Sequence, residues 1–143
     1  MAGEALMGLG TLNQGKSDKY AGEYNAQVAQ QNAAYTLQQS AEEERRSRVL
    51  SGKAIGDIRA NYGASGVTSD GSVLDVLEES AANAELDALT IRAEGRAKYA
   101  GYLNEADMSL YSGKNKYNAA KVTAAGYLVS GGEKAVTMAA GGV

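Results

Sequence analysis

The chain has 143 residues, enough for one modest domain, and a formal net charge of -3 from 14 basic and 17 acidic side chains. Cys, His, Trp, Phe and Pro are absent, which excludes disulfides, thiolate metal sites and histidine-based catalysis. The mixed charges form no clustered basic face of the kind that tight binding to nucleic acid requires. We therefore expect no cofactor, no metal site and no sequence-specific binding of nucleic acid.

The first segment, residues 1–16, is predicted to be a flexible N-terminus. Glu4 stands where a secretory signal would carry basic residues, and the apolar stretch around it is short. We therefore expect the protein to be made in a cytoplasm and not to enter a secretory route.

A long helix is predicted for residues 17–61, which are rich in Ala, Gln, Glu, Arg and Leu. At about 1.5 Å of rise per residue, this helix would be about 65 Å long, unless Gly52 or Gly56 interrupts it. Its middle, residues 24–41, carries no charge and few large apolar side chains. Such a polar helix is either held by a partner or frayed in the isolated chain, and both alternatives stay open.

A charged run follows at residues 42–48, with three Glu and three Arg. Glu42 with Arg46 and Glu44 with Arg48 have the i,i+4 spacing that stabilises helices. Because the three carboxylates nearly cancel the field of the three guanidinium groups, we interpret the run as a solvated charged face. A nucleic-acid patch is the less favoured alternative.

The clearest break in the chain lies at about residues 62–72, which hold three Gly and three Ser. This composition predicts a turn that includes Gly63, Gly66, Gly71 and Ser72, with backbone conformations at Gly66 and Gly71 that are costly for other residues. Ser72 is expected to cap a second helix, with Asp75 reaching back to it. The two helices would then pair across the turn.

The sequence therefore predicts an all-α fold: a long antiparallel helical hairpin over residues 17–118, part of an oligomer. Apolar and small residues at alternating steps of three and four would form the seam between the helices. The predicted seam consists of Leu50, Ala54, Ile58, Tyr62, Leu74, Leu77, Ala81, Ala84, Ala88 and Ile91.

The last segment, residues 119–143, is predicted to be a Gly- and Ala-rich tail that is helical or disordered. Its longest uncharged run, residues 122–132, has eleven residues, too few to span a bilayer as a helix. Small residues at four-residue spacing favour close contact with other copies or with a membrane, and both alternatives stay open. These residues are Gly126, Ser130, Gly131, Ala135 and Ala139.

Catalysis without His or Cys would need paired carboxylates. Acidic residues of the second helix supply several candidates, and none lies in an apolar pattern that would raise its pKa. They are Glu78, Glu79, Glu85, Asp87 and Glu94. We therefore expect solvated surface residues and no enzymatic activity.

Five segments of the chain resemble the smaller internal virion, or core, proteins of T7-like short-tailed bacteriophages. They are residues 24–33, 42–48, 59–67, 71–77 and 85–95, and the resemblance covers roughly residues 20–106. The Tyr-Gly-Ala-Ser-Gly-Val turn at 62–67, followed by Gly-Ser-Val-Leu-Asp-Val-Leu at 71–77, is the most specific part. Turn, cap and seam occur there in the order found in the family.

This resemblance implies a non-enzymatic protein stored in the phage head near the portal. It implies release at infection, when such proteins help to form a conduit for DNA across the host envelope. The implied partners are further copies of the chain, the portal, other internal virion proteins and, after release, the host outer membrane. The competing hypotheses are a structural helical adaptor that is not ejected, a secreted membrane-active translocator and a muralytic enzyme.

Overall fold

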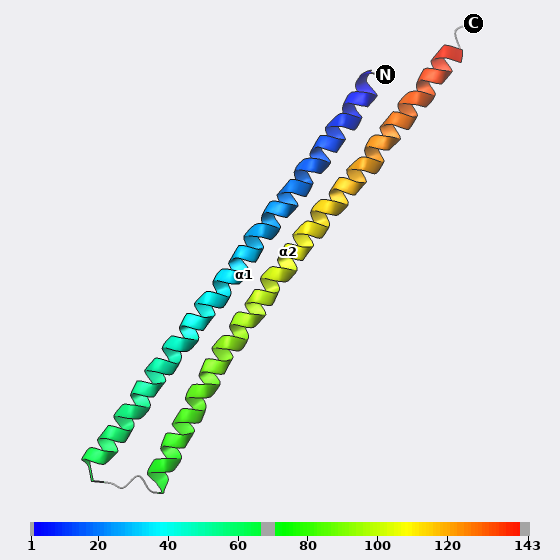
Figure 1. Cartoon of the computed structure of the whole chain (residues 1–143). Helices are drawn as coiled ribbons and strands as arrows, with labels where there is room; N and C mark the ends of the chain where they lie inside the picture. The colour runs from blue at the N-terminus through cyan, green and yellow to red at the C-terminus, as the bar shows by residue number, and fades with distance from the viewer. Residues whose placement is uncertain (1, 67–70, 141–143) are drawn as a thin grey trace. The chain divides into compact units, whose positions relative to one another are not determined.

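The computed structural model describes residues 2–66 and 71–140, and the side chains of residues 3–66 and 71–130. Two α-helices, α1 (Ala2–Ala64) and α2 (Ser72–Ala140), contain nearly all of these residues (Figure 1). No strand occurs in the described part of the chain. The predicted all-α class is therefore confirmed.

The helix bounds differ from the expected domain boundaries. Residues 2–16, expected to be flexible, form the beginning of α1, and α2 continues without a break through the expected tail to Ala140. Gly52 and Gly56 do not interrupt α1. The physical reason is that a single Gly costs a helix only about 1 kcal/mol relative to Ala, whereas the strong breaker, Pro, is absent from the chain.

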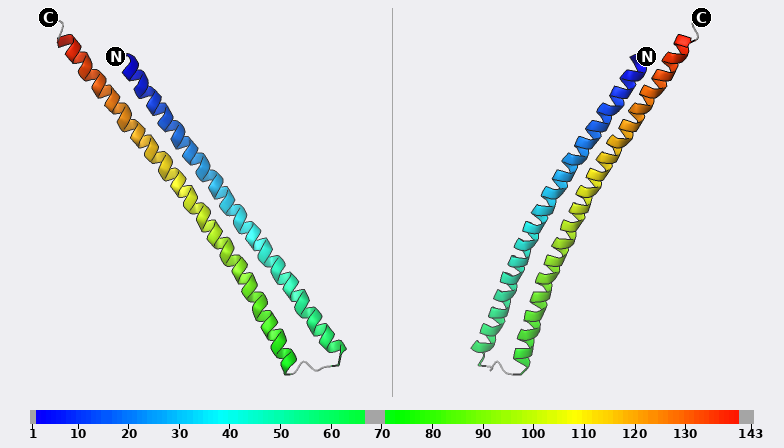
Figure 2. Two further views of the ribbon diagram at one scale, coloured as in Figure 1. Left: turned by 180° about the vertical axis from the view of Figure 1, so that it is seen from behind. Right: turned by 45° about the vertical axis from the view of Figure 1, so that its right-hand side comes forward.

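The chain divides into two compact units, each of which pairs a stretch of α1 with an antiparallel stretch of α2. The terminal unit consists of Met1–Gln31 and Leu103–Val143, and the turn unit consists of Asn32–Tyr102. Within each unit the two helical stretches lie side by side in both views of Figure 2.

The turn unit contains the end of α1 and the start of α2. Gly66 and Gly71 both have a φ of 73°, a conformation that only Gly adopts readily. The carbonyl of Gly71 accepts hydrogen bonds from the amides of Leu74 (3.0 Å) and Asp75 (3.3 Å). Gly71 thus directly precedes the first helical turn of α2, next to the predicted cap residue Ser72. Gly63, which the sequence assigns to the turn, lies inside α1.

The interior of both units is built mostly of alanine. Val73 and Leu77 are the only large apolar side chains that are buried in the described part of the chain. In the terminal unit, Ala26, Ala29 and Ala106 pack against one another. Because alanine buries little area, the two helices must approach closely to gain any packing at all.

Candidate functional site: the contact between the helices

The contact between α1 and α2 in the turn unit follows a repeat of eleven residues. On α2, Val73, Ala84 and Gly95 are buried or half-buried at intervals of eleven, and so are Leu77, Ala88 and Tyr99. On α1 the same interval separates the half-buried or buried positions 33, 44 and 55, and also 40, 51 and 62. An eleven-residue repeat averages about 3.67 residues per turn, slightly more than the ideal helix.

This repeat corrects the predicted seam at four positions. Leu50 and Leu74 are 60% and 45% exposed, and Ala54 and Ala81 are exposed as well. The positions that the repeat brings to the contact are their neighbours Ser51, Ile55, Val73 and Ser80. The remaining predicted residues lie on the buried side: Leu77 and Ala88 are buried, and Ile58, Tyr62, Ala84 and Ile91 are half-buried.

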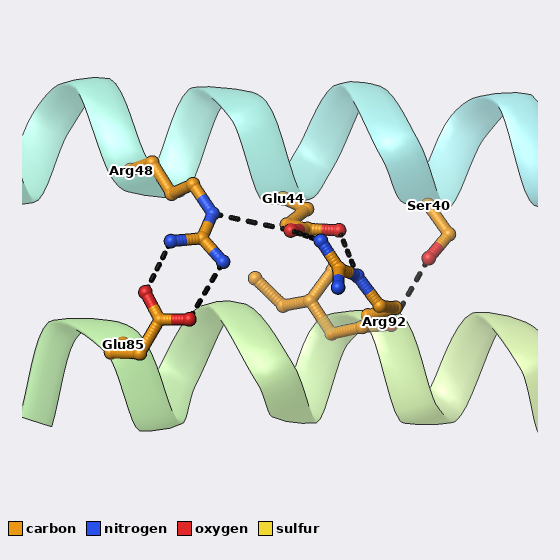
Figure 3. Close-up of polar contacts among 6 residues, drawn as sticks. Ser40, Glu44, Arg48, Glu85 and Arg92 are labelled. Atoms are coloured by element: carbon orange, nitrogen blue, oxygen red, sulfur yellow. Dashed lines mark hydrogen bonds and ion pairs between the residues drawn. The ribbon is translucent and has the colours of Figure 1, made fainter.

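Four charged side chains form an ion-pair network between the helices of the turn unit (Figure 3). Arg92 of α2 contacts both carboxylate oxygens of Glu44 of α1, with Nε donating to Oε2 at 2.8 Å. Arg48 of α1 contacts both oxygens of Glu85 of α2, with Nη2 donating to Oε1 at 2.9 Å. Arg48 Nε also donates to Glu44 Oε1 at 3.1 Å, which joins the two pairs into one network.

The network shifts the pKa of each carboxyl group that it contains. Glu44 is only 9% exposed, and hydrogen bonds from Arg92 and Arg48 hold its pKa below the ordinary value despite the opposing effect of desolvation. The hydrogen bonds from Arg48 likewise lower the pKa of Glu85, and both carboxylates raise the pKa of Arg48. Because Arg48, Arg92 and Glu85 remain about half-exposed, solvent screens these pairs, and they fix the helix register more than they stabilise the fold.

The outcome for the charged run differs from the predicted solvated face. Glu44 and Arg48 do form the predicted pair, but both turn toward α2. Glu42 bonds Arg45 at 2.8 Å, where the sequence predicts Arg46. The sequence did contain a signal for the cross-helix pairs. Glu85 and Arg92 are seven residues apart on α2, and an antiparallel hairpin with its turn near residues 62–72 places them opposite residues 44–48.

A side-chain hydrogen bond and a glycine bring the helices together next to the network. Ser40 of α1 donates its hydroxyl hydrogen to the carbonyl of Ile91 at 3.0 Å (Figure 3). Gly95 lies beside it, and a Cβ atom there would overlap the Ser40 side chain. The absence of a side chain at position 95 is therefore what lets Ser40 reach the backbone of α2.

The terminal unit uses glycine more extensively. Gly8, Gly15 and Gly22 are buried on one face of α1 at intervals of seven residues. A Cβ atom on Gly22 would lie 2.6 Å from the carbonyl oxygen of Ser109 and 3.1 Å from the Cα of Gly113. The backbones of α1 and α2 thus touch at the Gly22–Gly113 pair. This contact was not among the predicted ones, although the seven-residue spacing of the three glycines is a signal for it in the sequence.

The tail residues predicted to make contacts have different positions. Gly126 is exposed, with no atom within 4 Å of the place where its Cβ would be. Ser130 is half-buried and donates a hydrogen bond to the carbonyl of Tyr127 at 3.3 Å. Gly131, Ala135 and Ala139 belong to α2, but their side chains lie outside the described residues. In the described part of the chain, neither helix has a stretch apolar and long enough to cross a membrane.

No catalytic or metal centre is assembled from the candidate residues. Glu78, Glu79, Asp87 and Glu94 are exposed on α2, and no cluster of acidic residues in the described ranges could hold a metal ion. Residues 10–17 match the pattern G-x-x-x-x-G-K-S of a phosphate-binding loop. All eight residues are helical, however, and no strand leads into them, so no loop of backbone amides exists there to hold a phosphate.

A family model described as the T7 virus internal virion protein gp14 family matches residues 9–143, which is nearly the whole chain. The match confirms the resemblance to T7-like internal virion proteins that the sequence suggests. No curated protein and no solved structure matches the chain.

Proposed function

We propose that this chain, which belongs to the T7 virus internal virion protein gp14 family, is an ejection protein. As a member of this family it is an internal virion protein of a bacteriophage. In the proposed function it is stored in the head near the portal and leaves the particle at infection. In the host envelope it then helps to form a conduit for DNA.

The observation that carries this proposal is that small apolar side chains are buried and most large ones are exposed, the reverse of an ordinary globular protein. The interior is built of alanine, while large apolar residues lie on the outside of both units. In the terminal unit, Leu6 and Val122 are 71% and 74% exposed, and Leu9, Leu128 and Val129 are exposed as well. A protein that exposes its large apolar residues and buries small ones needs partners to cover them.

The weak contact between the helices also supports the proposal, because an ejected protein binds one set of partners in the particle and another set after release. The two helices are held together by small residues and by ion pairs that are partly exposed to solvent. Neither interaction is strong alone, because small side chains bury little area and exposed ion pairs are screened. The helices can therefore separate and repack against other partners at a small free-energy cost.

The partners that we propose are further copies of the chain, the portal and other internal virion proteins, and the host outer membrane after release. We expect the purified chain to be helical and either oligomeric or marginally stable, because it buries so little apolar area. Circular dichroism combined with sedimentation measures both properties. A compact monomer that unfolds cooperatively only at high temperature would contradict the proposed need for partners.

The decisive experiment compares the amount of this protein in intact particles, in particles that have released their DNA, and in the envelope of infected cells. We expect it to resist protease in intact particles, to be absent from emptied ones and to appear in the envelope fraction. The major capsid protein serves as the control, because it should remain with the emptied particle. Retention of the chain in emptied particles would instead favour the structural adaptor that is not ejected.

A second experiment separates storage from delivery. Deleting residues 131–143 removes the end of α2 while leaving intact the contacts of α1 with Gly113, Ala120 and Ala124. We expect such particles to assemble, to contain normal DNA and to adsorb normally, yet to deliver less DNA into cells. Normal infection by the deleted phage would show that this end of α2 has no part in the conduit.

A further inference from the structure

A groove of about 300 Å³ on the terminal unit is lined by three lysines around one aromatic ring. Lys19 comes from α1, and Lys114, Tyr117 and Lys121 come from α2. The backbone of Lys19 and the half-buried Tyr117 lie beside the glycine contact between the helices, whereas Lys114 and Lys121 are exposed and take no part in that contact.

The ring of Tyr117 holds two of the ammonium groups in place. The Nζ atom of Lys121 lies 4.2 Å from the ring centroid, and that of Lys19 lies 5.9 Å from it. Both distances are within the range of the cation–π attraction, which restricts where these flexible side chains point. The groove therefore presents its positive charges in a defined arrangement, unlike isolated surface lysines.

The charge of this groove is positive even though the whole chain is acidic. Glu23 is the only carboxylate that lines it, and it pairs with Lys19 at 3.3 Å. Lys114 and Lys121 have no carboxylate partner among the described side chains. The sequence explains this, because α2 carries only lysines as charged residues between Asp107 and Glu133. Up to two positive charges thus remain for a ligand, and a third becomes available if Glu23 releases Lys19.

We propose that this groove binds the phosphate backbone of double-stranded DNA without sequence preference. Lysine ammonium groups are suited to phosphate oxygens, and contacts to the backbone carry no sequence information. The family assigns the chain to the inside of a phage particle, where the packaged duplex is the abundant polyanion. The inference depends only on that location, so it stands or falls separately from the proposed conduit.

Two or three phosphate contacts give weak binding that depends strongly on salt. For three contacts, the logarithm of the binding constant should fall with the logarithm of salt concentration with a slope of about -2.7. Such binding would hold many copies of the protein against tightly packed DNA and release them when the DNA leaves.

The test measures binding of the full-length chain to a fluorescent random-sequence duplex by anisotropy, at several salt concentrations between about 50 and about 200 mM. We expect the double variant Lys114→Gln/Lys121→Gln to reduce the slope by about 1.8 and to weaken binding most at low salt. The matched control, Lys53→Gln/Lys116→Gln, removes the same charge outside the groove and should keep the wild-type slope. Tyr117→Phe should bind like the wild type, and Tyr117→Leu should bind more weakly.

Three outcomes would overturn the proposal. The first is no measurable binding of the duplex at low salt. The second is an equal loss of binding in the groove variant and in the charge-matched control, which would indicate a diffuse charge effect. The third is binding to vesicles of phosphatidylglycerol, dependent on Lys114 and Lys121, by a protein that ignores the duplex, which would assign the groove to lipid headgroups.

Discussion

The terminal unit and the turn unit hold α1 and α2 together by different means. In the terminal unit, Gly22 and Gly113 bring the two backbones into contact, and buried positions such as Gly8 and Gly15 are seven residues apart. In the turn unit, buried positions are eleven residues apart and the Glu44–Arg92 and Arg48–Glu85 pairs bridge the helices. The terminal unit thus relies on close backbone approach, whereas the turn unit combines one close approach, at Gly95, with charged pairs that set the register of the helices.

The difference shows how one chain can pair two helices without a conventional apolar core. A seven-residue repeat averages about 3.5 residues per turn and an eleven-residue repeat about 3.67, so the two units favour different supercoil senses. Glycine in the terminal unit makes the contact intolerant of any added atom. Half-exposed ion pairs in the turn unit make the contact sensitive to salt and acid instead.

The largest decrease in the free energy of unfolding is expected from substitutions at glycines of the terminal unit. Gly22→Ala places a Cβ against the backbone of Ser109 and Gly113, so the helices must move apart, at a cost of about 1–3 kcal/mol. Gly10→Ala is the matched control, because a Cβ there meets no atom within 4 Å. The control should stabilise the helix by up to about 1 kcal/mol through its better helix propensity. Urea unfolding followed by circular dichroism measures both, and shifts in the same direction would refute the close contact.

A smaller decrease in the free energy of unfolding is expected from a substitution at the turn. Gly66→Ala forces a residue with a Cβ to keep a φ of 73°, which should cost about 1 kcal/mol. Gly63→Ala, three residues earlier, lies within α1 in open space and should be neutral or stabilising. If both variants behave alike in the same unfolding measurement, position 66 does not have the left-handed conformation.

Acid should weaken the turn unit selectively. Because Glu44 and Glu85 have folded-state pKa values below the ordinary 4.5, their contribution is fully present above about pH 4.5. It is lost as the pH falls through the folded-state values, when the carboxylates become protonated and release Arg92 and Arg48. The melting temperature of the wild type should therefore fall more steeply below pH 4.5 than that of Glu44→Gln. Parallel curves for the two proteins would show that the network contributes nothing.

The smallest effect is expected from a single change in the network at neutral pH. Glu44→Gln leaves Arg92 without its carboxylate, whereas the control Glu42→Gln breaks only the exposed pair with Arg45 inside α1. Glu44→Gln should destabilise more than the control, because Glu44 is buried, but less than Gly22→Ala, because its partners Arg48 and Arg92 are about half-exposed and screened by solvent. The difference should shrink in high salt. A loss that is independent of salt would indicate packing at position 44, and not charge.

Much of this fold could be predicted from the sequence because helix formation and glycine-rich turns leave local signals. The all-α class, the break near residues 62–72 and the stripe containing Leu77, Ala88 and Ile91 all follow from residue type and spacing. The register of the stripe was harder to predict. Leu50 and Leu74 were predicted to lie in the seam because they are large and apolar. In the structure, the eleven-residue repeat places their neighbours Ser51 and Val73 at the contact.

The contacts that sequence reasoning missed depend on the partner helix. Gly22 looks like a weak point in α1 until Gly113 is brought opposite to it, and only then does its missing side chain become a requirement. Glu44 has a plausible partner four residues away in Arg48, so nothing local pointed to Arg92 on the other helix. Pairing between distant segments is a property of the fold, which a single sequence does not display.

The most direct test of the difference between the two units is amide hydrogen exchange of the purified chain, measured in low and in high salt. We expect faster exchange in high salt for residues 40–48 and 85–95, where ion pairs bridge the helices of the turn unit. We expect unchanged exchange for residues 8–29 and 106–124 of the terminal unit, where the contact is made by Gly and Ala. Equal acceleration in both units, or acceleration confined to the terminal unit, would show that the ion pairs do not set the turn unit apart from the terminal unit.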